Sequence, residues 1–391
     1  MSSIATFPTA AETCTPDTVD VPVKAALTSR LPSLDGWRAI SILAVLGSHT
    51  KDVAGFPMEN MTFFQHAFDG HLGVRFFFVI SGFLITWLML MEEKKDGSVS
   101  LKRFYLRRAV RILPVYLVFL AVLAALQFFT PFHQSLAGWL GNLTFTTNYL
   151  HTTHASDHLW SLAVEEQFYL LWPVAFVFFK PQLNLKKCFT IVAVMLIAAI
   201  SGRFILAHTP DSSRLLQRVF HQWSFFNNAD SLALGCLSAI LLARGPRRFI
   251  ATLQNAVAPV MLTGAGLIAL PIALHYLPLP GALQSASWFV EVCCGRSIQS
   301  AGFALLMLQS VLLSNTGFYK LLNFRPLAQI GVLSYSLYIW QQLFCTHPDA
   351  FGLQHVWWMS HTFWLLPVIA AACLSYYGLE RPLLQLRHRF R

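Results

Sequence analysis

The segment LDGWRAISILAVLGSHT (34–50) is apolar enough to enter a bilayer, yet it contains Asp35, Arg38 and His49. In a helix that turns about 100° per residue, Arg38 and His49 lie on one face, about 16 Å apart along the axis. Asp35 falls within about 40° of that face. Ionisable residues inside a membrane helix are costly, so their alignment indicates a functional site. The alternative is that Asp35 and Arg38 lie among lipid headgroups and His49 marks the far end of the helix.

Composition places the rest of the chain in a membrane as well. Of its 391 residues, 55% are apolar and only 12% are charged, and the mean hydropathy is +0.54. A soluble domain has about twice that charged fraction. We therefore predict an all-α polytopic membrane protein with about ten transmembrane helices. The expected spans are 36–54, 72–91, 109–130, 161–179, 188–206, 228–243, 257–277, 297–314, 327–346 and 361–379.

The net charge of +10 is unevenly distributed between the two sides of these spans. The tails and alternate loops of one side hold most Lys and Arg residues, including the run from Lys94 to Arg111. The loops of the other side hold only Lys51, Arg214, Arg218 and Arg296. By the positive-inside rule, we expect both termini to be cytoplasmic. The excess charge thus indicates topology rather than a nucleic-acid partner.

The chain ends and the cysteines give further expectations. Residues 1–33 are polar and lack the apolar core of a signal peptide, so we expect a disordered cytosolic tail. A transmembrane domain over 34–383 and a basic cytosolic tail over 384–391 follow. Most of the seven cysteines lie in apolar runs, which indicates buried thiols and no structural disulfide. The neighbours Cys293 and Cys294, near the outer face, leave a disulfide open.

A basic cluster lies where the third expected span begins. In FYLRRAVRILPVY (104–116), Arg108 and Arg111 are three residues apart and share a helical face, and Arg107 extends the cluster. Paired guanidinium groups at a helix start suit phosphate oxygens. Membrane topology and anionic lipids alone would also place basic residues there.

The fourth expected span contains two adjacent carboxylates. In DHLWSLAVEEQFYLLWPV (157–174), Glu165 shares a helical side with Ser161 and Tyr169, and Glu166 follows it. A carboxylate in the hydrocarbon region must be paired, protonated or exposed to water. We predict that one of the two forms an ion pair with an intramembrane Arg and that the other faces a site.

Other polar residues allow more than one interpretation. Ser81-Gly82, in the middle of the second span, favours close helix packing. Asp230 is an isolated carboxylate at the membrane edge or a helix cap. Glu380 is expected in a salt bridge at the cytosolic interface. The run HTTHASDH (151–158) lacks the helical His pair and neighbouring Glu of zinc hydrolases, so we assign no metal.

Seven segments, taken in order, resemble the membrane acyltransferase type 3 family, the group of O-antigen and exopolysaccharide O-acyltransferases. They extend from residue 34 to about 383 and are LDGWRAISILAVLGSHT, GVRFFFVISGFLIT, FYLRRAVRILPVY, HLWSLAVEEQFYLLWP, NADSLALGCLSA, IGVLSYSLYIW and YYGLERPL. The resemblance implies a ten-helix enzyme of the inner (plasma) membrane. Such an enzyme transfers an acyl group from cytosolic acyl-CoA to a hydroxyl, often of a carbohydrate on the outer side. With no soluble esterase-like domain appended, we expect the stand-alone form.

The resemblance also implies roles for individual residues. Arg38 and His49 match the family's essential Arg-x10-His pair, and Arg108 and Arg111 match its Arg-x-x-Arg motif, which is associated with the acyl donor. The other matched positions are Ser81 to Phe83 in the second helix, the acids Glu165 and Glu166, and Glu380 in the last helix. Two departures concern the acceptor: Arg75 replaces a common Asp, and Gln341 stands where many members have a His.

The implied chemistry agrees with the residues. A neutral imidazole at His49 can take a proton from a sugar hydroxyl, and Glu165 would orient or stabilise it. Because no well-supported Ser or Cys nucleophile sits beside His49, we expect direct transfer from the thioester, with an acyl-enzyme as the less favoured route. Arg38 would stabilise an oxyanion, steady the thioester or hold Asp35.

Further site residues are grouped by expected role. We expect no resident cofactor; acyl-CoA, with acetyl as its acyl group, is the co-substrate. The residues expected to bind acyl-CoA are Arg108, Arg111, Arg107 and Ser81. The residues expected to support the site are Asp35, Trp160, Tyr169, Asp230 and Glu380.

Two other functions fit some of these features. A proton-coupled transporter could use His49 and Glu165 as proton relays. However, no inverted repeat is visible, and the cytosolic Arg pair has no role in proton coupling. An acyl-sensing or assembly partner without turnover is the third hypothesis.

Overall fold

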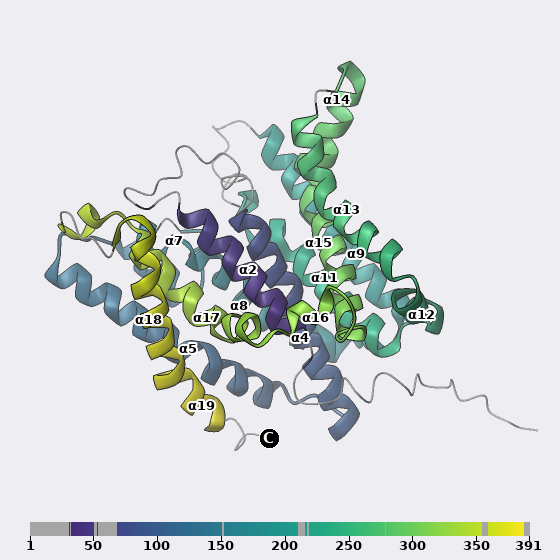
Figure 1. Ribbon diagram of the computed structural model, residues 1–391, viewed down its shortest axis with the longest axis horizontal. Helices are drawn as coiled ribbons and strands as arrows, with labels where there is room; N and C mark the ends of the chain where they lie inside the picture. The colour runs from purple at the N-terminus through teal and green to yellow at the C-terminus, as the bar shows by residue number, and fades with distance from the viewer. Residues whose placement is uncertain are drawn as a thin grey trace, which may run out of the picture.

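The computed structural model describes residues 31, 33–50, 53, 69–150, 152–209, 216, 219–277, 279–353 and 359–386. The expected N-terminal tail, with Cys14, lies almost entirely outside these residues, as do residues 387–391 of the expected C-terminal tail. Every regular element in the described ranges is helical, which confirms the predicted all-α fold class (Figure 1).

The chain forms sixteen α-helices within the described ranges, joined in places by short 3-10 or π segments. The α-helices are α2 (Leu34–His49), α4 (Gly70–Asp96), α5 (Leu101–Phe129), α6 (Leu136–Leu143), α7 (His154–Asp157), α8 (Leu159–Phe179), α9 (Leu185–His208), α11 (Phe225–Arg244), α12 (Arg247–Asn255), α13 (Val257–Tyr276), α14 (Gly281–Trp288), α15 (Gly295–Leu312), α16 (Tyr319–Leu322), α17 (Arg325–Cys345), α18 (Leu365–Ser375) and α19 (Arg381–Leu386). The short segments are η3 (Pro181–Leu183), η4 (Phe289–Cys294), η5 (Pro348–Phe351), η7 (His361–Trp364) and η8 (Tyr376–Glu380).

Six helical stretches in the described residues are long and apolar enough to cross a membrane. They are α4, α5, α7 with α8, α9, α11 and α13, and each coincides with an expected span. The other four expected spans fall on α2, α15, α17 and α18. Of these, α2 has only 16 residues and α18 only 11, while α15 and α17 contain buried Gln side chains. The count of ten and the orientation of the termini stay predictions.

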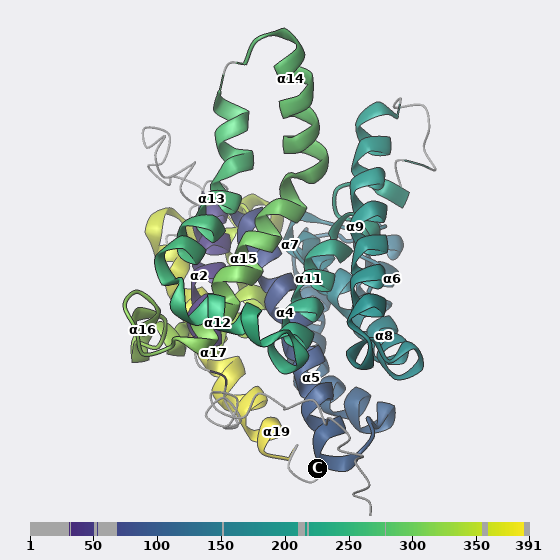
Figure 2. The same ribbon diagram turned by 90° about the vertical axis from the view of Figure 1, so that its right-hand side faces the viewer.

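The helices differ in how deeply they are buried in the bundle. In the most apolar window, 72% of the residues of both α4 and α11 are buried, against 17% in α13 and 22% in α9. Helix α11 packs most extensively on α4, and α2 packs on both α4 and α17. The central position of α2, α4 and α17 explains why they tolerate polar side chains, since neighbouring helices separate them from lipid. Figure 2 shows α13 and α14 projecting from the bundle.

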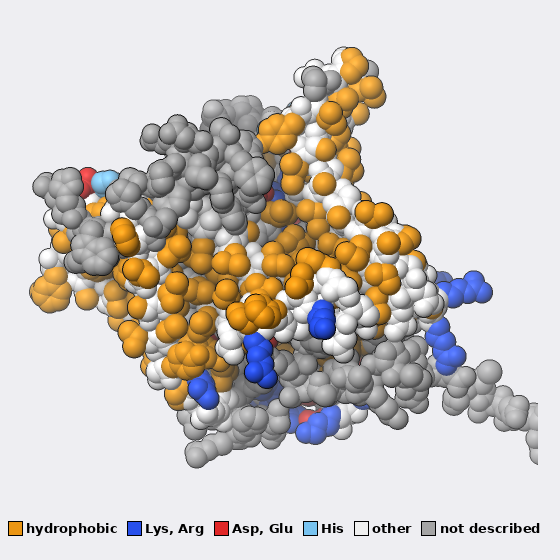
Figure 3. All heavy atoms as spheres, viewed as in Figure 1, with side chains coloured by type: hydrophobic (Ala, Val, Ile, Leu, Met, Phe, Trp, Pro, Cys, Tyr) orange, Lys and Arg blue, Asp and Glu red, His pale blue; other side chains and the backbone are white. Residues whose placement is uncertain are grey.

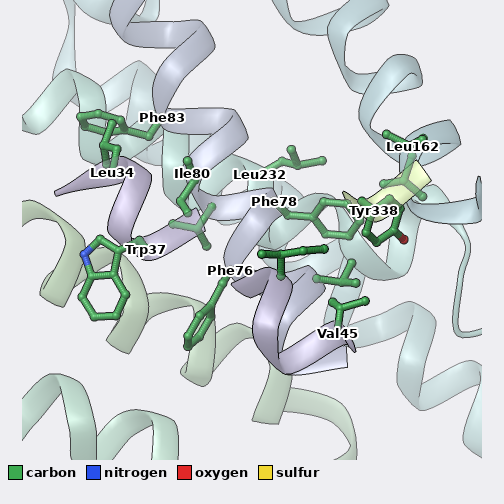
Figure 4. Packing of buried hydrophobic residues seen from close by; sticks show 14 of the residues in the cluster. Leu34, Trp37, Val45, Phe76, Phe78, Ile80, Phe83, Leu162, Leu232 and Tyr338 are labelled. Carbon is green, nitrogen blue, oxygen red and sulfur yellow. The ribbon is translucent and has the colours of Figure 1, made fainter. Parts of the chain in front are cut away.

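The exterior of the bundle is largely apolar. Figure 3 shows hydrophobic side chains across the middle of one face, with most of the visible Lys and Arg side chains below them. Phe128 and Phe129, at the end of α5, are 83% and 79% exposed. Exposed apolar side chains of this extent suit contact with lipid rather than water. The buried core, drawn in Figure 4, combines residues of α2, α4, α8, α11 and α17.

The contact between α4 and α11 depends on two glycines that face the partner helix. A Cβ atom at Gly82 would overlap the carbonyl oxygen of Leu232, and one at Gly235 would overlap that of Val79. Small residues allow membrane helices to approach closely. The interpretation of Gly82 as a packing residue is therefore confirmed.

We expect Gly82→Ala to destabilise the fold by about 1–3 kcal/mol, because the methyl group must separate α4 from α11. Thermal unfolding in detergent measures the change as a lower Tm. Gly266→Ala is the matched control, since Gly266 lies exposed on α13 and a Cβ there meets no atom within 4 Å. Equal Tm values for the two variants would contradict the packing role of Gly82.

Candidate functional site

A first cavity lies between α2, α4, α5, α8 and α17, with an empty volume of about 920 Å³. We call it the inner cavity, a name that follows the orientation expected from the Lys and Arg distribution. Its charged lining residues are Arg38, Arg108, Arg111 and Glu165. Three cations against one carboxylate make this cavity suited to an anionic ligand. Among the described residues, no carboxylate lies within 4.0 Å of Arg108 or Arg111, whereas Arg38 Nη1 is 3.9 Å from Asp35 Oδ1. The donors of Arg108 and Arg111 are thus not committed to a carboxylate of the described chain.

The arginines of α5 divide into two groups. The Arg108 guanidinium stacks 3.7 Å from the centroid of the Tyr169 ring, a cation–π contact that directs it into the cavity. Arg107 instead forms an ion pair with Glu92 at 2.5 Å, and it does not line the cavity. Glu92 at the end of α4 thus holds the Arg107 guanidinium outside the lining of this cavity, and the expectation that Arg107 binds acyl-CoA stays a prediction.

The start of α5 also differs from expectation. Ser100 caps this helix, and its hydroxyl accepts a hydrogen bond from the Arg103 backbone at 3.3 Å. Arg108 therefore lies two turns into the helix. The partial positive charge of a helix N-terminus decays within the first turn, so it does not assist Arg108 or Arg111.

A chain of hydroxyl groups holds the carboxylate of the inner cavity. The Tyr169 hydroxyl donates to Glu165 Oε2 at 3.1 Å, and the Ser81 hydroxyl hydrogen-bonds to the same Tyr169 oxygen. Since a phenol has one proton, Ser81 is the donor to Tyr169. Ser161, Glu165 and Tyr169 all line the cavity, in agreement with their predicted shared face on α8, and Ser81 joins them from α4.

The expected ion pair of the two acids is absent from the described residues. No Lys or Arg nitrogen there lies within 4.0 Å of Glu165 or Glu166, so that prediction is wrong. At Glu165, a hydrogen bond from the Tyr169 hydroxyl, itself bonded to Ser81, stands where an Arg partner was expected. Glu166 lies outside the cavity lining, and its buried Oε1 has no hydrogen-bond partner. Of the two acids, only Glu165 faces the inner cavity.

An outer cavity, with an empty volume of about 760 Å³, contains His49 in its wall. Other polar and aromatic lining residues are Ser48, His71, His154, Asp157, His158, Trp160, Trp223, Tyr338 and Gln342. Within the described part of the chain, no three His, Cys, Asp or Glu side chains are arranged to hold a metal ion. The arrangement suits a polar, hydroxyl-bearing molecule, because imidazole, indole and amide groups donate and accept hydrogen bonds around it.

The tautomer of His49 is determined by its own helix. His49 Nδ1 lies 3.0 Å from the carbonyl oxygen of Val45, which only accepts hydrogen bonds. Nδ1 therefore carries the proton, and Nε2 is the basic nitrogen. We expected Glu165 to orient this ring or to stabilise its cation; Glu165 lines the other cavity, and the Val45 carbonyl is the group that contacts Nδ1.

The two cavities adjoin one another. Val74 of α4 and Tyr338 of α17 line both of them. Helix α2 passes along the pair, with Arg38 in the inner wall and His49 in the outer wall. The predicted alignment of Arg38 and His49 on one helical face is thus observed, and it brings them to two chambers rather than to one.

The remaining predicted residues lie around these chambers or away from them. Trp160 lines the outer cavity and stacks on Trp223, with ring centroids 6.1 Å apart. Glu380 is 7% exposed and accepts a hydrogen bond from Ser336 of α17. Glu380 lines neither cavity, and no Lys or Arg nitrogen of the described residues lies within 4.0 Å of it, so the expected salt bridge is replaced by the hydrogen bond from Ser336.

Asp230 belongs to a separate buried cluster. Arg203 of α9 donates to Asp230 Oδ2 at 2.6 Å, Ser297 of α15 hydrogen-bonds to the same oxygen, and the Ser231 backbone donates to Oδ1 at 2.8 Å. Asp230 is fully buried and lines neither cavity. It is therefore neither isolated nor a helix cap: it joins α9, α11 and α15.

We expect Asp230→Asn to destabilise the protein by about 3–5 kcal/mol, because it leaves the Arg203 charge buried without a counter-charge. Arg203→Met in the same background should restore part of the loss, since it removes that charge. Unfolding in detergent measures both effects. If Asp230→Asn alone is as stable as the parent, the ion pair between Arg203 and Asp230 does not hold the helices together.

Several lining residues were not singled out from the sequence. Tyr338, Val74 and Gln342 belong to apolar or mixed runs, where nothing distinguishes a wall residue from core. Ser161 was expected on the Glu165 side of its helix, and His158 has the same signal, because it lies seven residues before Glu165 and shares its helical face. Cys293 and Cys294 are both free thiols, which resolves the disulfide that was left open.

Comparison with known proteins places these observations in a family. A family model described as an acyltransferase domain matches residues 31–380. The peptidoglycan O-acetyltransferase OatA of Listeria monocytogenes is 27% identical over 331 residues, which cover 79% of this chain and 48% of that protein. The O-acetyltransferase OatA of Staphylococcus aureus (strain NCTC 8325 / PS 47) is 27% identical over 335 residues, which cover 79% of this chain and 50% of that protein. The chain thus spans about half the length of these relatives. No solved structure matches it.

Proposed function

This chain belongs to the acyltransferase 3 family, and from that premise we propose that it transfers an acyl group, most simply acetyl, from acyl-CoA to a hydroxyl of a carbohydrate. The observation that carries the proposal is the pair of adjoining cavities. One is lined by three arginines and suits an anionic donor, and the other contains the imidazole of His49, whose Nδ1 contacts the Val45 carbonyl and leaves Nε2 as the basic nitrogen of the neutral ring.

The donor would occupy the inner cavity. Acyl-CoA carries several phosphate charges, and forked guanidinium donors bind phosphate oxygens well. Arg108 and Arg111 supply such donors two to three turns into α5, and Arg38 adds a third charge from α2. With the cytoplasmic orientation expected from the Lys and Arg distribution, this end of the cavity faces the compartment that contains acyl-CoA.

The acceptor would occupy the outer cavity. His49 Nε2 accepts the proton of the acceptor hydroxyl as the hydroxyl oxygen attacks the thioester carbonyl carbon. The new carbon–oxygen bond forms, the carbon–sulfur bond breaks, and the departing thiolate takes the proton from the imidazolium. The products are an ester and the free thiol of CoA. His49 is returned to the neutral form, so the cycle needs no cofactor.

The other polar groups have secondary roles in this scheme. Glu165 accepts a hydrogen bond from Tyr169 in the same cavity as the arginines, where its charge would offset part of theirs and limit how tightly the product is retained. Arg38 is placed to stabilise charge that develops on the thioester oxygen. Asp35, at 3.9 Å, keeps Arg38 on the cavity side of α2.

The acceptor class follows from the family and from the outer cavity. Trp160 and Trp223 present aromatic faces in the outer wall, and His and Gln side chains surround them. Aromatic faces combined with hydrogen-bonding groups suit a sugar ring, which has both apolar and hydroxyl surfaces. Peptidoglycan, named for one relative, and other cell-surface polysaccharides are the acceptors to test, in a chain that we place in the plasma membrane.

The purified chain in a lipid nanodisc, given acetyl-CoA and peptidoglycan or polysaccharide fragments, tests the proposal. Free thiol release together with ester-modified glycan in mass spectrometry is the expected result. Movement of a solute across the membrane without thiol release would indicate a carrier. Binding of acyl-CoA with neither outcome would indicate a partner protein without turnover.

A further inference from the structure

Val74 and Tyr338 form the partition between the inner and outer cavities. Both side chains are 7% exposed, and both contribute to the lining of each cavity. Val74 lies one turn into α4, and Tyr338 lies in the second half of α17. Figure 4 shows Tyr338 and Phe78 among the buried side chains of this region, and Phe78 also lines the inner cavity.

Hydrogen bonds and ring contacts hold the Tyr338 side of the partition in place. Its hydroxyl donates to the carbonyl oxygen of His158 at 2.8 Å, and it lies 2.5 Å from the hydroxyl of Ser161. Since the Tyr338 proton goes to His158, Ser161 is the donor in the second bond. The ring also makes an edge contact with Phe77, with centroids 6.4 Å apart. A ring that is held at its hydroxyl and packed against Phe77 cannot move aside without breaking these contacts.

The position of the partition constrains the acyl group. In the proposed reaction, the thioester carbon must meet a hydroxyl activated by His49, which lies on the other side of Val74 and Tyr338. The carbonyl carbon is therefore at the partition during transfer. The remaining carbon atoms of a longer acyl chain would then need space beside Val74. The side chains of Val74 and Tyr338 already fill that space.

Resting on the proposed acyl transfer, we propose that Val74 and Tyr338 determine the length of the acyl chain that this protein transfers. Val74 has the smaller side chain, and its two methyl groups occupy the space that the third and fourth carbons of an acyl chain would need. Tyr338 has the more rigid side chain, because hydrogen bonds to Ser161 and to the His158 carbonyl hold its hydroxyl. This assigns chain-length selection to two residues, neither of which has a titratable or nucleophilic role in the reaction.

Chain-length preference in the Val74→Ala variant tests this assignment. The ratio of kcat/KM for acetyl-CoA to that for butyryl-CoA should fall by about 10- to 200-fold, because each methylene in a fitted apolar site contributes a factor of that order. Tyr338→Phe, which removes the anchoring hydroxyl without removing the ring, should lower the same ratio to a smaller extent. Thiol release measures both.

Val79→Ala is the matched control. Val79 lies on the same helix, is fully buried and lines neither cavity, so the same two methyl groups are lost without a change at the partition. Its acetyl-to-butyryl ratio should equal that of the parent. A Val74→Ala protein that folds and keeps the parental ratio overturns the inference. If the parent itself releases no thiol from any acyl-CoA, the proposed acyl transfer fails instead. If Val74→Ala does not fold, Tyr338→Phe decides: an unchanged ratio there overturns the inference.

Discussion

His49→Ala should lower kcat for acyl transfer by about 10²- to 10⁴-fold, the contribution of a well-placed general base. The reason is the tautomer: the Val45 carbonyl holds the proton on Nδ1, so Nε2 is the basic nitrogen in the outer cavity. The KM for acyl-CoA should change little, because the arginines that we propose to bind the donor line the other cavity. Steady-state thiol release at varied acyl-CoA concentration separates the two parameters.

His133→Ala is the control for this variant. His133 is exposed between α5 and α6 and lines neither cavity, so its loss should leave kcat at the parental value. The role of His49 as the base is contradicted if His49→Ala retains more than about a tenth of the parental kcat. A large rise in KM with unchanged kcat would place His49 in donor binding instead.

Arg108→Ala and Arg111→Ala should each raise the KM for acyl-CoA by about 10- to 100-fold. A hydrogen bond between charged partners contributes about 1.5–3 kcal/mol, and neither guanidinium has a carboxylate partner within 4.0 Å in the described residues. The corresponding Lys variants should lose less, since they keep the charge but lose the planar fork. Thiol release at varied acyl-CoA concentration measures each KM.

Two comparisons make the arginine prediction specific. Lys102→Ala removes an exposed charge from the first turn of the same helix and should leave the KM unchanged. Acetyl-pantetheine, which has the thioester but lacks the phosphates, should react equally slowly with the parent and with both Arg variants. Slower reaction of the variants with acetyl-pantetheine would show that the arginines act on the thioester or on the fold rather than on phosphate.

The sequence was sufficient to predict the features that depend on a single helix, such as which of its side chains share a face. Helical class follows from composition, and the alignment of Arg38 with His49 follows from 3.6 residues per turn. The same rule placed Arg108 with Arg111 and Ser161 with Glu165, and all of these pairs appear in cavity walls. The role of Gly82 in helix packing was also readable, because a small residue in an apolar membrane segment lets a neighbouring helix approach closely.

The sequence was not sufficient where the partner lies on a distant helix. Nothing near Arg107 distinguishes it from Arg108, yet Glu92 of α4 withdraws it from the cavity. Asp230 was an isolated carboxylate in its own segment, and its partner Arg203 lies on another helix. Helices α2, α15 and α17 were expected to cross the membrane like the lipid-facing ones, but burial inside the bundle allows them to carry amides or a carboxylate.

The sequence by itself thus determined that this chain is helical, that it suits a membrane, and which ionisable side chains share a helical face. These properties depend on local geometry and on the transfer of side chains from water to lipid, which each segment fixes alone. Tertiary structure alone decided that Arg38 and His49 line separate chambers, that Val74 and Tyr338 stand between them, and that Val45 rather than Glu165 orients the imidazole. A chamber is the space that several helices leave between them, so its walls depend on how five distant segments pack together.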